Sequence, residues 1–208
     1  MKLHKLLFLS FAFFLFTGLA AAQERRTAEE YIKVLEGERR VSGLQVARVV
    51  DALNLKPGQH ICDLGSGSGL FTRPMAQALG PQGVVYAVDV DPDLLKHVVK
   101  TAQEQKITNI KPILGGEADP KLPEPVDLIA IFDTLHHIPN SAEYLKGLRR
   151  YLKPGGRIAI IDFSKTWPAG HEKMVYKQED LDKWMKAAGY TLVTQHYFLD
   201  NDFFVIYQ

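Results

Sequence analysis

The sequence is poor in cysteine and has no surplus of either charge. Cys62 is the only cysteine among 208 residues, which excludes an internal disulfide and a metal site built from several cysteines. Lysine and arginine total 25 against 24 for aspartate and glutamate, so the formal net charge is only +1. Because proteins that bind nucleic acid usually carry a basic surplus, we expect no nucleic-acid partner.

Long apolar runs are also scarce, and the longest lies within the first 22 residues. Lys2 and Lys5 precede an almost wholly apolar stretch over residues 6–19, and alanines follow up to Ala22. This order is typical of a secretory signal peptide cleaved after Ala22. We therefore expect export to the periplasm or the medium, and a single domain over residues 23–208. The alternative is a membrane anchor over residues 1–22, although such a short apolar segment is near the lower limit for a membrane span.

A glycine-rich turn stands at the centre of the remaining sequence. A short apolar run over residues 61–64 is followed by Gly65, Gly67 and Gly69, and then by a helical pattern over residues 70–79. This order predicts a buried strand, a tight turn and a helix whose N-terminus faces the turn. Glycine lets the backbone bend sharply and a ligand approach closely, while a helix N-terminus favours a carboxylate or phosphate. The dinucleotide fingerprint G-x-G-x-x-G would need a glycine at position 70, where this chain has leucine.

A second apolar run, over residues 84–88, ends in a carboxylate. Asp89 follows this run, twenty residues after Gly69. In doubly wound folds an acidic side chain at this strand end accepts hydrogen bonds from the ribose hydroxyls of a nucleotide. Asp91 is a second candidate, but it suits equally well the N-cap of a helix that begins at Pro92.

Strand and helix patterns alternate up to residue 163. Strands are expected over residues 61–64, 84–89, 109–114, 126–132 and 157–163, and helices over residues 42–53, 70–79, 92–105 and 140–152. This alternation predicts parallel strands with helices on both faces of the sheet. Near the end, strands over residues 190–199 and 203–207 are joined by so short a turn that they must be antiparallel. The predicted fold is therefore α/β: a doubly wound, seven-stranded, mostly parallel sheet with a C-terminal antiparallel hairpin.

The pattern Asp-x-Gly-x-Gly-x-Gly over residues 63–69, the acidic end of the second strand and the final hairpin together resemble the class I S-adenosylmethionine (SAM)-dependent methyltransferases, whose fold is Rossmann-like. The resemblance implies that the glycines let the backbone run past the carboxypropyl part of SAM. It also implies that Asp63 braces the turn and reaches the cofactor amine through water, and that Asp89 holds the ribose. The residues implied in cofactor binding are Asp63, Gly65, Ser66, Gly67, Gly69, Asp89, Val90, Glu117, Ala118, Asp119 and Asp133.

The loop over residues 116–119 departs from the family pattern. Members of the family often have Gly-Asp-Ala here, in contact with the adenine, whereas this chain has Gly-Glu-Ala-Asp. Glu117 and Asp119 are therefore both candidates for the adenine contact.

Candidate catalytic groups follow the fourth strand. Asp133, where the resemblance places motif IV of the family, is followed closely by His136 and His137. A carboxylate or an imidazole here could act as a general base on an acceptor oxygen or nitrogen. Alternatively, the two histidines only hydrogen-bond the backbone at a strand-to-helix turn. Because adjacent histidines do not share a helix face, we expect no metal site. Trp167, in the irregular segment 164–177, is the best candidate for an acceptor pocket.

The resemblance implies an enzyme that transfers a methyl group from SAM, a reaction in which the protein mainly positions the acceptor and excludes water. No nucleic-acid surface or protein-recognition module is visible in the sequence, so we expect a small-molecule or lipid-like acceptor. Two other functions stay open: a SAM-binding protein without turnover, and an NAD-dependent oxidoreductase. The leucine at position 70 and the final antiparallel hairpin argue against the oxidoreductase.

Overall fold

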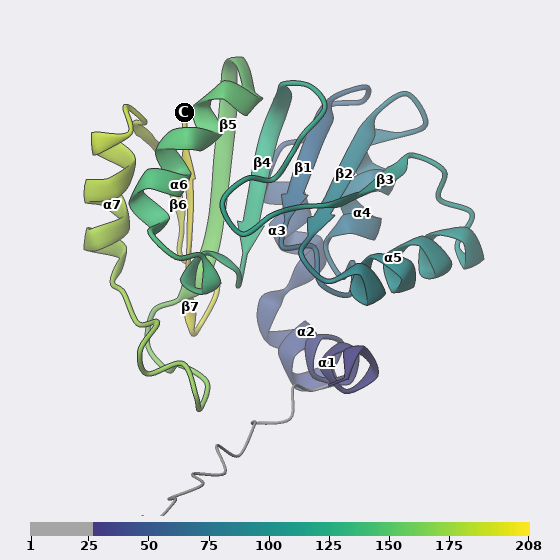
Figure 1. The fold of residues 1–208 in the computed structure, drawn as a ribbon, viewed down its shortest axis with the longest axis horizontal. Helices are drawn as coiled ribbons and strands as arrows, with labels where there is room; N and C mark the ends of the chain where they lie inside the picture. The colour runs from purple at the N-terminus through teal and green to yellow at the C-terminus, as the bar shows by residue number, and fades with distance from the viewer. Residues whose placement is uncertain (1–26) are drawn as a thin grey trace, which may run out of the picture.

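Seven strands form one sheet in the computed structural model, which describes residues 27–208 (Figure 1). The strands are β1 (His60–Leu64), β2 (Val84–Asp89), β3 (Ile110–Leu114), β4 (Val126–Phe132), β5 (Leu152–Phe163), β6 (Leu192–His196) and β7 (Asp202–Tyr207). Their order across the sheet is β3-β2-β1-β4-β5-β7-β6. All pairings among β1 to β5 are parallel, whereas β7 is antiparallel to both β5 and β6. The predicted α/β sheet with its C-terminal hairpin is confirmed.

Helices cover both faces of the sheet, because successive residues of each buried strand point to opposite sides. The helices are α1 (Ala28–Leu35), α2 (Glu38–Leu44), α3 (Val46–Ala52), α4 (Thr72–Leu79), α5 (Pro92–Glu104), α6 (Ser141–Gly147) and α7 (Gln178–Ala187), with 3-10 helices η1 (Leu135–His137) and η2 (Leu148–Tyr151). Cys62 and Ile129 pack in one core with α6 and α7, while Ile61 and Leu128 pack in a second core with α3 and α4.

Two helices that the sequence predicts as continuous are interrupted. The expected helix over residues 42–53 is broken at Gln45, whose backbone is left-handed (φ 45°) and whose side-chain amide donates to the Phe198 carbonyl at 2.6 Å. The expected helix over residues 140–152 is α-helical only to Gly147, since glycine weakens an α-helix, and it continues as the 3-10 helix η2. Both breaks leave the order of elements unchanged.

The carboxyl ends of the parallel strands meet at one edge of the sheet, where the N-terminal helices also lie. Figure 1 shows α1 and α2, in purple, below this end of the sheet. An ion pair joins Arg40 of α2 to Asp133, the residue that follows β4. Sequence-distant segments are therefore brought to the edge where open α/β sheets bind their ligands.

Among residues 27–208, none of the helices has both the length and the apolar character needed to span a membrane. The predicted export signal or anchor over residues 1–22 lies outside the described residues, and its role stays a prediction from the sequence.

The packing of β7 against the sheet gives a stability prediction. Phe204 of β7 is fully buried, and its ring lies 4.6 Å from that of His196 and 6.3 Å from that of Phe132, measured between centroids. Phe204→Ala should lower the free energy of unfolding by about 3–5 kcal/mol, because it leaves a cavity in the core. Tyr197→Ala is the control, since Tyr197 is 82% exposed. If urea unfolding showed the same loss of unfolding free energy in Phe204→Ala and Tyr197→Ala, the packing of the hairpin described here would be wrong.

Candidate functional site

The glycine turn is tied to the neighbouring strand by backbone hydrogen bonds. The amides of Gly65 and Ser66 both donate to the carbonyl of Val88, at 2.8 and 2.9 Å. Gly65, Gly67 and Gly69 have φ values of 73°, 53° and 80°, in the left-handed region that favours glycine. These bonds hold the turn directly beside the end of β2, as the sequence predicts.

Two of the glycines also leave room for neighbouring side chains. A Cβ on Gly65 would lie 2.2 Å from Cγ2 of Thr134, which follows β4. A Cβ on Gly67 would lie 2.9 Å from Cδ1 of Leu35, at the end of α1. The turn is thus packed against the end of β4 on one side and covered by α1 on the other. Close approach requires glycine at position 65 in addition to φ, whereas a shift of the flexible Leu35 side chain would relieve the contact at position 67.

Asp89 lies at the centre of this arrangement. Its carboxylate accepts from the Gly67 amide at 2.8 Å and from the Asp91 amide at 3.0 Å. Burial raises the pKa of Asp89, and the backbone donors act in the opposite direction. The carboxylate of Asp91 instead caps α5 by accepting from the amide of Asp93 at 2.8 Å, which agrees with the N-cap interpretation. Val90, between them, is exposed.

Asp63 braces the turn from the buried side. It is 3% exposed, and Oγ1 of Thr72 in α4 donates to its carboxylate at 2.5 Å. Burial raises the pKa of Asp63 to about 7, although the hydrogen bond from Thr72 lowers it in part. The predicted bracing role therefore has a partner, Thr72, that is not identified by the sequence motif.

The loop after β3 is less closely joined to the turn. Glu117 and Ala118 are exposed, and Gly116 and Asp119 form a short bridge. The carboxylate of Asp119 pairs with Arg150 at 2.6 Å and accepts from the Tyr151 hydroxyl at 2.7 Å, both in η2. Of the candidates for the adenine contact, Asp119 is thus engaged by η2, while Glu117 is exposed to solvent.

Asp133 is held by a partner that the sequence does not single out. Its backbone is left-handed (φ 48°), its side chain is 8% exposed, and Nη2 of Arg40 lies 2.5 Å from one carboxylate oxygen. Burial raises the pKa of Asp133, opposed by the charge of Arg40. Arg40 also donates to the Leu35 carbonyl at 2.7 Å, which links α1 and α2 to the end of β4. A second ion pair, Glu36 with Arg73 at 2.7 Å, fixes α1 over the beginning of α4.

The two adjacent histidines lie in η1 and have different surroundings. Nδ1 of His136 lies 2.8 Å from Asp162, the second-last residue of β5, which is fully buried. The Tyr176 hydroxyl donates to the other oxygen of Asp162 at 2.8 Å. His137 is exposed, but partial burial of its ring and the neighbouring histidines lower its pKa to about 4. The ring of Trp167 lies 5.4 Å from that of His136, so this predicted pocket residue does join the site.

Asp162 is the member of this cluster that sequence reasoning missed, whereas Tyr176 and His171 belong to the late segment considered for an acceptor pocket without a role of their own. The one available signal was the position of Asp162 near the end of the fifth strand, since strand ends at this edge bear the site. Tyr176 and His171 come from the irregular segment after β5, whose path has no sequence pattern.

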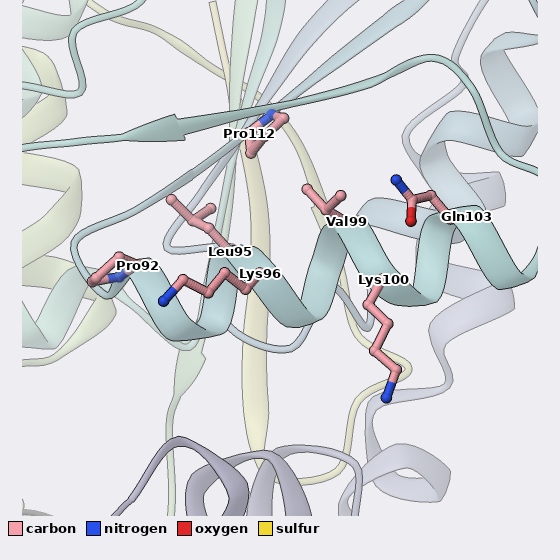
Figure 2. Close-up of a pocket in the computed structure, with 7 residues that line it drawn as sticks. All are labelled: Pro92, Leu95, Lys96, Val99, Lys100, Gln103 and Pro112. Carbon is pink, nitrogen blue, oxygen red and sulfur yellow. The ribbon is translucent and has the colours of Figure 1, made fainter.

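A shallow hollow outside the predicted site lies along α5 and the edge strand β3 (Figure 2). It is lined by Pro92, Leu95, Lys96, Val99, Lys100, Gln103 and Pro112. None of the predicted site residues is among them, so this hollow is separate from the glycine turn and the histidines of η1.

Comparison with known proteins identifies a family and relatives that this chain resembles. A family model described as a methyltransferase domain matches residues 55–196. The ubiquinone/menaquinone biosynthesis C-methyltransferase UbiE of Burkholderia vietnamiensis is 32% identical over 117 residues, which cover 55% of this chain and 47% of that protein. The chain thus spans about half the length of the curated relatives it matches.

Solved structures show the same fold. A SAM-dependent methyltransferase from Aquifex aeolicus superposes with a TM-score of 0.77 at 24% identity, covering 88% of this chain and 98% of that one. The magnesium protoporphyrin IX methyltransferase from Synechocystis, solved with bound SAM, has a TM-score of 0.64 at 19% identity, covering 88% and 84%.

The close approach at the turn can be tested by comparing two glycines. Gly65 and Gly58 both have left-handed backbones, with φ of 73° and 81°, but a Cβ on Gly58 would meet nothing within 4 Å. In both alanine variants the free energy of unfolding should fall by about 1 kcal/mol, because of backbone strain. In Gly65→Ala the free energy of unfolding should fall by about 1–3 kcal/mol more, because the new Cβ clashes with Thr134. Urea unfolding of the two variants measures the difference, and equal losses would show that the turn has room to relax.

The raised pKa of Asp63 predicts a pH dependence of stability. Between about pH 4 and 7 the folded protein keeps a proton on Asp63 that the unfolded chain has already lost, so this group's stabilising contribution declines as pH rises. Asp63→Asn should remove that decline, which we expect to be about 2–4 kcal/mol in wild type. Denaturant unfolding at pH 4.5 and 7.5 compares the two proteins. Parallel pH profiles would mean that Asp63 titrates normally.

Proposed function

Because the chain belongs to the class I SAM-dependent methyltransferase family, we propose that it transfers a methyl group from SAM to a small-molecule or lipid-like acceptor. The observation that carries this proposal is the bond between the Gly67 amide and the Asp89 carboxylate, which joins the glycine turn to the acidic end of β2. A turn that only connected β1 to α4 would not need left-handed glycines in contact with two other strand ends.

The residues at this edge fit the cofactor. Gly65, Gly67 and Gly69 present backbone without side chains, and Asp89 offers carboxylate oxygens for hydroxyl donors. Asp63, behind the turn, attracts a positively charged amine in its ionised form, and such an amine would in turn lower the raised pKa of Asp63. When bound, SAM supplies an electrophilic methyl group on its sulfonium. The protein's own task is then to hold the acceptor in line and to exclude water.

Leu35 and Arg40 would have to share this edge with the cofactor. The side chain of Leu35 lies against Gly67, and Arg40 ties α2 to Asp133. Entry of SAM therefore requires Leu35 to shift, and the two N-terminal helices would then cover the bound cofactor. Such a cover excludes water from the reacting groups.

The acceptor class is supported by the relatives and by the side chains around η1. The UbiE proteins, named for ubiquinone/menaquinone biosynthesis, are 31–32% identical over the matched segment. In this chain Phe163, Trp167 and Tyr176 form a row of rings with centroids 5.4 and 5.9 Å apart. These rings offer an apolar wall for a ring-containing or lipid-like acceptor.

His136 is the candidate general base in this proposal, and because its side chain is only 1% exposed, an acceptor can reach it only if neighbouring side chains move. An ionised carboxylate only accepts hydrogen bonds, so Asp162 directs the Nδ1 proton of His136 toward itself and leaves a lone pair on Nε2. His137, beside it, is exposed. Asp133 is engaged by Arg40 and is better suited to holding α2 than to accepting a proton.

Incubation with methyl-labelled SAM and a total lipid extract of bacterial membranes tests the proposal. We expect label in an organic-phase product and, by calorimetry, binding of SAM but not of NAD. Asp89→Ala should weaken SAM binding at least tenfold, because it removes the carboxylate of the site. Asp93→Ala is the matched control, since Asp93 lies nearby in the first turn of α5 and its carboxylate pairs with exposed Lys96.

The outcomes separate the remaining alternatives. Binding of SAM without labelled product would support a SAM-binding protein without turnover. Absence of SAM binding would overturn the proposal as a whole, and unchanged affinity in Asp89→Ala would remove Asp89 from the site.

A further inference from the structure

Three imidazoles converge beside the carboxyl end of β4. His136 and His137 come from η1, and His171 comes from the irregular segment after β5. Their ring centroids lie 4.1, 5.2 and 5.3 Å apart. Each ring offers one nitrogen such that the three nitrogens all lie within 4.8 Å of one another. Although His136 and His137 are adjacent in η1, both of their rings lie beside the ring of His171.

The cluster has the features of a ligand set rather than of a packed ring stack. Nδ1 of His171 is buried and has no hydrogen-bond partner within the described part of the chain. His136 is fixed through Nδ1 by Asp162, which leaves its other nitrogen directed away from that carboxylate. A carboxylate that orients a histidine in this way is the usual second partner of a metal-bound imidazole.

We propose that His136, His137 and His171 bind one divalent first-row transition metal ion of the zinc type. Three neutral nitrogen donors suit zinc, cobalt, nickel or copper, and they do not suit magnesium or calcium, which prefer oxygen. A tetrahedral zinc ion with bonds of about 2.0–2.1 Å needs its nitrogens about 3.4 Å apart. The nitrogens must therefore draw together by up to about 1.4 Å, and exposed His137 and half-buried His171 can do so by rotation.

Three protein ligands leave the fourth position of the ion open. His137 is exposed, so this position is accessible from solvent at the same edge of the sheet as the glycine turn. The metal would take the lone pair with which His136 is proposed to accept a proton, and the two roles therefore exclude each other.

Titration of the untagged full-length protein with Co2+ and Zn2+ tests the inference. We expect one ion per chain by equilibrium dialysis, a visible absorption band for bound Co2+ that Zn2+ abolishes, and no competition from a large excess of Mg2+. His171→Ala and His137→Ala should each weaken binding at least 100-fold. Both residues lie at the surface side of the cluster, so the variants should keep the circular dichroism spectrum of wild type.

His60→Ala is the matched control, because His60 begins β1 at the opposite edge of the sheet and pairs with Glu124. Its metal binding should equal that of wild type. Wild-type binding weaker than about 1 mM, or equal binding in His171→Ala and wild type, would overturn the inference. The titration uses neither SAM nor acceptor, so its result is independent of the proposed methyl transfer.

Discussion

The hydrogen bond from the Gly67 amide to the Asp89 carboxylate is the constraint on which the site depends. It fixes the turn after β1 against the end of β2, while the absence of a side chain on Gly65 lets Thr134 bring the end of β4 to the same place. Three strand ends thereby meet within one small region. Parallel strands alone would place their ends at one edge, but not in contact.

The N-terminal helices complete this edge through charge and apolar contact together. Arg40 pairs with buried Asp133, Arg73 pairs with Glu36, and Leu35 lies over Gly67. A buried carboxylate without a partner would be costly, so the pair with Arg40 couples the position of α2 to the end of β4. The contacts that hold α1 and α2 over this edge lie where a cofactor would enter. The stability of these two helices is therefore linked to ligand binding.

The end of β4 divides the site into two environments. Asp133 faces Arg40 and the N-terminal helices, whereas His136, three residues further on, faces Asp162, Tyr176 and the segment after β5. The backbone changes direction between these two side chains, because Asp133 is left-handed (φ 48°) and η1 begins two residues later, at Leu135. Charge pairing thus dominates on the side proposed for the cofactor, and imidazole and aromatic rings dominate on the side proposed for the acceptor.

The sequence by itself determined the order of strands and helices, the antiparallel hairpin, the glycine turn and the position of Asp89. These features depend on local rules: hydrophobic periodicity, glycine at left-handed positions and a turn too short for parallel strands. The N-cap role of Asp91 likewise depends only on its neighbours in the sequence. Only the tertiary structure decided the partners that come from distant segments: Arg40 for Asp133, Thr72 for Asp63, Asp162 for His136 and His171 beside both histidines. Those contacts depend on how irregular segments cross the sheet edge. The path of an irregular segment cannot be predicted from hydrophobic periodicity, because such a segment has no repeating pattern.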